Sequence, residues 1–188
     1  MKKAIFILIT ILIPMVSFSQ NAFDKFEDDE NVTSLIVNNR MFRLLTSMNL
    51  NTDDKESQQF LDLIKGIDNL KVFMSEDKST RARMEATLAS YLKSNKSLEQ
   101  LMRFKEDGKI IKFYIKEGKD ADHVKELLMH ATGIKMGNFT HDETHDKRQE
   151  QTVIFSITGD FDLKKISKLT SDLNIPGSKH LKKINKEN

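Results

Sequence analysis

The segment from residue 99 to 116 constrains the fold of this chain more than any other, because it predicts a β-hairpin. Asp107-Gly108 supplies the two residues that a type I′ turn needs at positive φ. A two-residue loop also determines which residues of the two strands face each other. The expected pairs are Glu106 with Lys109, Phe104 with Ile111, and Met102 with Phe113.

Side chains alternate between the two faces of a strand, so this register separates an apolar face from a basic one. The apolar face comprises Met102, Phe104, Ile111, Phe113 and Ile115. The basic face comprises Arg103, Lys105, Lys112, Tyr114 and Lys116. We expect the first face to lie against the core and the second to be at least partly exposed to solvent.

Residues 1–19 have the layout of a secretory signal peptide. Lys2-Lys3 precede an apolar run from residue 4 to 13, and Pro14 and small polar residues follow it. The alternative, a membrane anchor, needs about 20 uninterrupted apolar residues, and Pro14 ends the run too early. We expect cleavage after Ser19, export to the periplasm or the cell exterior, and no transmembrane segment after cleavage.

The charge and cysteine content narrow the possible partners. Removing Lys2 and Lys3 from the 30 basic residues leaves 28, which equals the 28 acidic residues, so the processed chain has no net charge. Bulk affinity for nucleic acid is therefore not expected. The absence of cysteine excludes disulfides and a lipid-modified cysteine at the cleavage site.

The remaining chain alternates between strand and helix patterns, with no linker-like stretch between residues 32 and 174. Further strands are expected at 32–37, 70–74, 134–140 and 151–158, and helices near 41–48, 53–65, 78–94, 118–133 and 163–173. The predicted organisation is a signal peptide at 1–19, an acidic arm at 20–31, one domain at 32–175 and a basic tail at 176–188.

Residues 70–140 read β-α-β-β-α-β in this assignment, which is the ferredoxin-like split motif. The predicted fold class is therefore α/β (α+β). We expect a two-layer sandwich in which helices cover one face of a mostly antiparallel sheet, with extra elements before and after the ferredoxin-like core.

Two histidines, His141 and His145, form a pattern that is typical of metal chemistry. Histidines at i and i+4 can share a helical face and bind zinc. This segment is a polar run without an apolar side or an evident third ligand, so a solvated loop is the preferred interpretation. A metal-dependent enzyme or metal-binding protein remains the alternative. Asp160 and Asp162 are interpreted as helix caps rather than catalytic carboxylates.

Other catalytic patterns are missing from the sequence. There is no cysteine, no Gly-x-Ser-x-Gly turn and no glycine-rich phosphate loop, because the seven glycines are scattered. His123 and His130 flank the apolar stripe of a predicted helix and are expected on its surface. We expect no enzymatic activity and no cofactor.

The outer face of the predicted sheet is the preferred candidate for binding. Its candidate residues are Lys71, Phe73, Arg103, Lys105, Lys112, Tyr114 and Lys116. Aromatic residues among cations are typical of sheets that stack single-stranded nucleic acid, but an exported protein seldom meets that ligand. A protein partner, a second copy or an anionic glycan or lipid surface suits the compartment better, and an ordinary amphipathic surface is the alternative.

Several short motifs together resemble the domain of unknown function 4252 family. They include Met41-Phe42, Leu70-Lys71-Val72, Glu106-Asp107-Gly108 and the run from Thr158-Gly159-Asp160 to Leu169. The resemblance spans essentially the whole processed chain. It implies an exported α/β protein of uncharacterised function, and it supplies no catalytic residue. Our preferred hypothesis is a non-enzymatic envelope protein that binds a partner, with envelope regulation as one setting. Many members of that family carry a lipid-anchoring cysteine after the signal, which this chain lacks.

Overall fold

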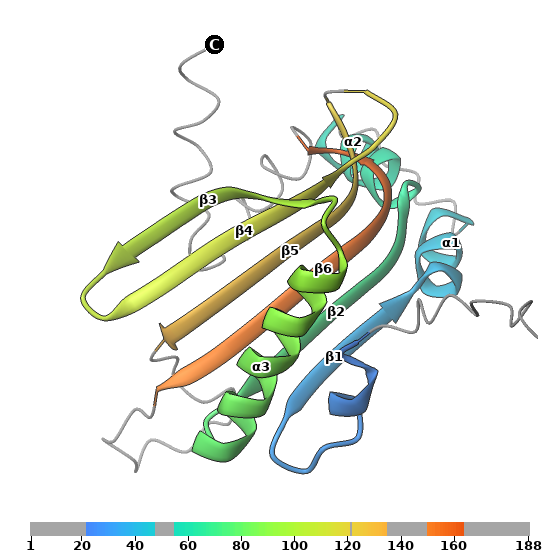
Figure 1. The fold of residues 1–188 in the computed structure, drawn as a ribbon. Helices are drawn as coiled ribbons and strands as arrows, with labels where there is room; N and C mark the ends of the chain where they lie inside the picture. Colours follow the sequence, from blue (N-terminus) through green and yellow to red (C-terminus); the bar gives the residue numbers. More distant parts are fainter. Residues whose placement is uncertain (1–21, 48–54, 121, 135–149, 164–188) are drawn as a thin grey trace, which may run out of the picture.

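A single antiparallel sheet organises the protein. The computed structural model describes residues 22–47, 55–120, 122–134 and 150–163. Six strands lie in the order β1-β2-β6-β5-β4-β3 (Figure 1). They are β1 (Thr33–Asn38), β2 (Ile67–Ser75), β3 (Leu98–Glu106), β4 (Lys109–Glu117), β5 (His123–Ile134) and β6 (Gln151–Asp162). The described helices are η1 (Asp24–Phe26), α1 (Asn39–Ser47), α2 (Lys55–Ile64) and α3 (Lys78–Ser94).

The predicted hairpin is confirmed as β3 and β4. Asp107 and Gly108 have φ values of 47° and 79°, as a type I′ turn requires. The three expected pairs, from Glu106–Lys109 to Met102–Phe113, are present. A bulge between Gln100 and Met102 shifts the register only beyond that point.

One predicted helix is wrong, because most of residues 118–133 form strand β5. The sequence there carries Val124, Leu127, Leu128 and Ala131 at helical spacing. All four are buried, but Leu127 and Ala131 belong to one core and Leu128 to another. A strand that is buried on both faces has nearly continuous apolar residues, and such a run also satisfies a helical pattern.

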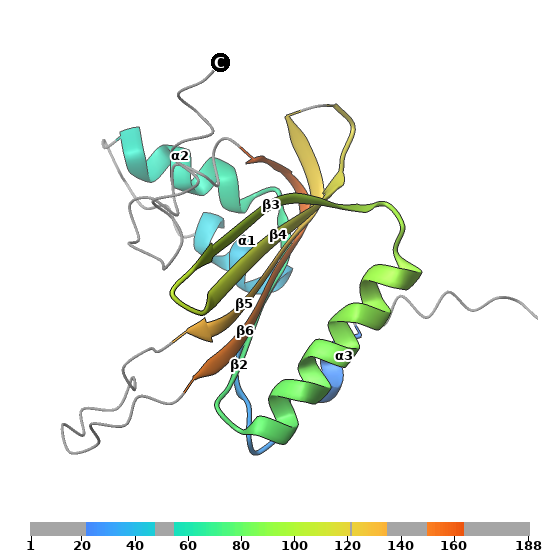
Figure 2. The same cartoon turned by 60° about the vertical axis from the view of Figure 1, so that its left-hand side comes forward.

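The ferredoxin-like and two-layer arrangements are not confirmed. With β5 in place of a helix, the described part of residues 70–140 reads β-α-β-β-β. Beyond Ile134, the strand predicted at 134–140 lies outside the described residues. Figure 2 also shows α1 and α2 on one side of the sheet and α3 on the other. We call these sides the α1–α2 face and the α3 face.

Each face carries its own core. On the α1–α2 face, Phe42, Leu63 and Ile64 pack with the predicted apolar side of the hairpin, including Ile111 and Phe113. On the α3 face, the core comprises Phe23, Phe26, Phe73, Met84, Leu88, Leu98, Tyr114, Leu128 and Ile154. The side predicted to face solvent is therefore partly interior.

The N-terminal arm is part of the second core. Phe23 and Phe26, on either side of the start of η1, are fully buried against Phe73 of β2. Lys71 Nζ lies 2.6 Å from Asp24 Oδ1 and 2.7 Å from Glu27 Oε1. The acidic arm thus neutralises a lysine of the sheet while its aromatic residues fill the core beneath.

Gly159 occupies a place that no other residue fits well. Its φ is 153°, and a Cβ there would collide with the Gly66 carbonyl oxygen. The close approach lets Asp160 N donate a 2.8 Å hydrogen bond to the same oxygen. This accounts physically for the glycine in the Thr158-Gly159-Asp160 motif.

The first prediction concerns the arm. Replacing Phe26 with Ala should lower the free energy of unfolding by about 3–5 kcal/mol, because a fully buried ring leaves a cavity. Urea unfolding followed by circular dichroism measures the change. Asp28→Ala, an exposed change in the same arm, should have an effect below about 0.5 kcal/mol. Equal effects of the two changes would contradict the role of the arm in the core.

Candidate functional site

The α3 face divides the seven predicted binding residues into a covered and an uncovered group. Phe73 has no exposed surface, and Lys71 is held by Asp24 and Glu27. Burial alone would lower the pKa of Lys71, but the hydrogen bonds with the two carboxylates outweigh burial and raise it. These two residues are structural and are not available to a partner.

Tyr114 and Lys116 also leave the candidate set. The Tyr114 ring belongs to the α3-face core, and its burial raises the pKa of the hydroxyl. Lys116 lies directly opposite Glu126 in the β4–β5 register, so an acid balances its charge. Three of the seven predicted residues remain: Arg103, Lys105 and Lys112.

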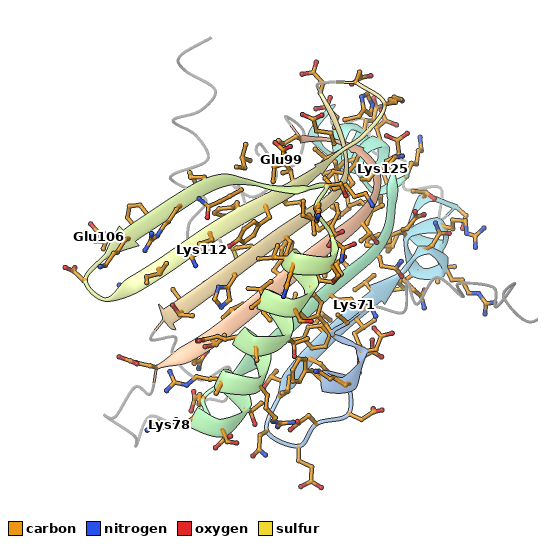
Figure 3. The ribbon with its side chains drawn as sticks, viewed as in Figure 1. Lys71, Lys78, Glu99, Glu106, Lys112 and Lys125 are labelled. Atoms are coloured by element: carbon orange, nitrogen blue, oxygen red, sulfur yellow. The ribbon has the colours of Figure 1, made fainter. Side chains whose placement is uncertain are left out.

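These three cations lie where α3 does not cover the sheet. Figure 3 labels Lys112 on β4 and Lys71 on β2, with α3 crossing the face between them. Arg103 and Lys105 are exposed, and Lys112 is half-buried. No ion pair to any of the three forms within residues 22–47, 55–120, 122–134 and 150–163.

The strand register aligns two of these cations with a histidine. Arg103 of β3 lies opposite Lys112 of β4, and Lys112 lies opposite His130 of β5. Neighbouring strands are about 4.8 Å apart, so the three side chains follow one another across the sheet. We call Arg103, Lys112 and His130 the basic row, with Lys105 beside it on β3.

His130 is a member of the row that the sequence did not predict. Its side chain is 7% exposed, and its two ring nitrogens find no hydrogen-bond partner in the described structure. Burial and the neighbouring Lys112 charge lower its pKa to about 4, so the ring is neutral at pH 7. Alternation along β5, which puts Glu126, Leu128 and His130 on one face, was the signal that could have identified it.

A second buried polar pair lies on the same face. Tyr91 of α3 has its hydroxyl 2.9 Å from both carboxylate oxygens of Glu126, so it donates to one of them at a time. Burial raises the pKa of Glu126, and burial together with the carboxylate raises that of Tyr91. The pair ties α3 to β5 and gives the buried charge a donor.

Metal binding finds no support in the described residues. His141 and His145 lie outside them, and no group of three histidines or acids within them could hold a metal ion. Asp160 and Asp162 lie at the end of β6, and Lys119 Nζ lies 3.7 Å from Asp160 Oδ2. Leu163, directly after Asp162, is helical, and the rest of the helix that they were predicted to cap lies outside the described residues.

A comparison with protein families decides the relationship that the motifs indicated. The family described as a domain of unknown function (DUF4252) matches residues 26–169. The chain belongs to the DUF4252 family. The matched region contains all the described strands and the whole basic row.

The family itself names no activity. No curated protein and no solved structure matches this DUF4252 member. Among its described helices, none is both long and apolar enough to cross a bilayer. Any function must therefore be argued from the arrangement of its residues.

The second prediction tests the Tyr91–Glu126 pair. Tyr91→Phe should lower the free energy of unfolding at pH 7 by about 1–3 kcal/mol, because a buried carboxylate loses its donor. The same change made in a Glu126→Gln background should cost less, since no buried charge remains. Urea unfolding of the four proteins gives the comparison, and equal costs in the two backgrounds would contradict the pairing.

The third prediction concerns His130. Because its folded pKa of about 4 lies below the ordinary 6.5, the unfolded chain takes up the proton first as the pH falls. The contribution of neutral His130 to the free energy of unfolding is therefore complete above pH 6.5 and falls by about 3 kcal/mol toward pH 4. The His130→Leu variant should not show this decrease in stability. Urea unfolding of both proteins at pH 7 and pH 4 measures it, and parallel changes would show that His130 is not buried as described.

Proposed function

We propose that this DUF4252 member is a non-enzymatic binding module of the cell envelope, which holds an acidic segment of a partner protein on its basic row. The observation that carries the proposal is the pairing of Arg103 with Lys112. Like charges directly opposite each other on a sheet are destabilising. No acid of the described structure relieves this pair, so carboxylates of a partner would gain two charge-assisted contacts there.

Lys105 and His130 extend the same surface. Lys105 is exposed two positions from Arg103 on β3, so an extended segment running along this edge could meet both cations. The neutral ring of His130 retains one N–H donor and lacks a partner in the described structure. Buried polar groups are normally hydrogen-bonded, so an acceptor of the ligand that reaches the ring would satisfy it.

Location in the envelope is part of the proposal and is supported by the signal-peptide pattern of residues 1–19. That compartment favours a protein ligand over nucleic acid. The absence of cysteine supports a protein that is not anchored through a lipidated cysteine. A metal function of His141 and His145 has no supporting observation beyond their spacing, so we do not propose it.

The fourth prediction uses Arg103→Glu. It converts a repulsive cross-strand pair into an attractive one, so stability should rise by about 0.2–1 kcal/mol. Binding of a short polyglutamate peptide should nevertheless weaken about fivefold, as expected for one exposed ion pair. Titration of the isotope-labelled protein, followed by amide chemical shifts, measures both the affinity and the location of the contact.

The matched control is Lys78→Glu. It makes the same charge change at the exposed first residue of α3, away from Lys112 (Figure 3), where an acid is well tolerated. Peptide affinity should fall less than twofold in this variant. Shifts confined to β3, β4 and the part of β5 around His130 in the parent protein would support the proposal. Shifts spread over all exposed lysines, or equal losses in the two variants, would contradict it.

A further inference from the structure

The two edges of the sheet differ in how they are protected. The edge strands are β1 and β3. Strand β3 carries four charged residues and the bulge near Met102, and both features discourage pairing with another strand. Strand β1, with the sequence Thr-Ser-Leu-Ile-Val-Asn, has no charge and no proline, and its register with β2 is continuous. Of the two edges of the described sheet, β1 is therefore the one suited to accept another strand.

Apolar side chains gather at the β1 edge. Leu35 is 55% exposed on the α1–α2 face, and Ile36 is 39% exposed on the α3 face. In α1, which follows β1 directly, Met41 and Leu44 are 48% and 54% exposed, whereas Phe42 and Leu45 pack on the core. Two large apolar side chains of this helix are thus turned away from the core. Exposed apolar residues beside a free edge are typical of an association surface.

We infer that two copies of the chain associate through β1, antiparallel, and join their sheets across a two-fold axis. The axis is perpendicular to the sheet and passes through Leu35. The α1–α2 faces of the two copies therefore lie on the same side of the joined sheet. It places Leu35 opposite Leu35 of the second copy, and Thr33 opposite Val37. The Leu35, Met41 and Leu44 side chains of the two copies then lie on one face near the axis.

The charges that flank β1 identify the occupant as a second copy. Exposed acids Asp28 and Glu30 precede the strand, and exposed Arg40 and Arg43 follow it. Antiparallel pairing places the start of β1 in one copy beside the end of β1 in the other, so Glu30, shortly before the strand, approaches Arg40, shortly after the partner's strand. A parallel arrangement would instead bring like charges together. The edge is therefore complementary to itself.

This association is independent of the proposed function. Strands β1 and β3 lie at opposite edges of the sheet, so a dimer through β1 leaves the basic row free in both copies. A two-fold dimer would present two such rows to a partner. Multivalent presentation strengthens binding without new contacts.

Sedimentation equilibrium of the purified protein tests the inference. The parent protein should have twice the mass of one chain, and Leu35→Lys should have the mass of one chain, because two lysines would meet at the axis. Since Leu35 is more than half exposed, the variant should keep the circular dichroism spectrum of the parent. Leu101→Lys, which alters an exposed leucine on the other edge strand, is the matched control and should remain dimeric.

Charge exchange tests the geometry separately. Glu30→Arg should raise the dimer dissociation constant about two- to fivefold, and adding Arg40→Glu should restore it. A parent protein of single-chain mass would overturn the inference. So would a Leu35→Lys variant that remains dimeric, a Leu101→Lys variant that becomes monomeric, or a double exchange that weakens association further.

Discussion

Burial on both sides of one sheet is the constraint on which the rest of this structure depends. The central strands β5 and β6 carry apolar residues on both faces, and helices lie on each face to cover them. The α1–α2 face receives two helices and the apolar side of the hairpin. The α3 face receives one helix and the arm, which together cover the half of the sheet that contains β2 and β6. The uncovered remainder of that face is where the charged residues of β3 and β4 lie.

Charge is managed differently in the two halves of the α3 face. Beneath α3 and the arm, two charged groups have partners of their own: Lys71 contacts two carboxylates, and Glu126 accepts a hydrogen bond from the Tyr91 hydroxyl. In the part of the face that α3 and the arm leave uncovered, Arg103 and Lys112 lie opposite each other and have no such partner in the described structure. Lys71 is neutralised within the domain, whereas Arg103 and Lys112 repel each other, and this repulsion is the physical reason for proposing an anionic ligand at that place.

The hairpin could be predicted because its determinants are local. Two turn residues and strict alternation are sufficient for register, and no distant contact alters them. Strand β5 could not be predicted, because its apolar run satisfies helical and strand patterns equally and the choice depends on covering helices far away in sequence. The error also hid His130, whose position on the α3 face follows only from strand alternation. In α1 the helix was predicted, but only the structure decided which of its apolar residues reach the core: Phe42 and Leu45 do, and Met41 and Leu44 do not.

The sequence by itself determined the turn, the hairpin register and the separation of apolar from basic residues, since these depend on neighbours within a few positions. Tertiary structure alone decided which basic residues stay available, because the arm and α3 reach Lys71, Phe73 and Tyr114 from outside the hairpin. It likewise decided that β1 is an edge and that Arg103, Lys112 and His130 share a row. The alternation of side chains along a strand determines which residues share a face. The packing of elements that are distant in sequence determines which part of that face is exposed to solvent.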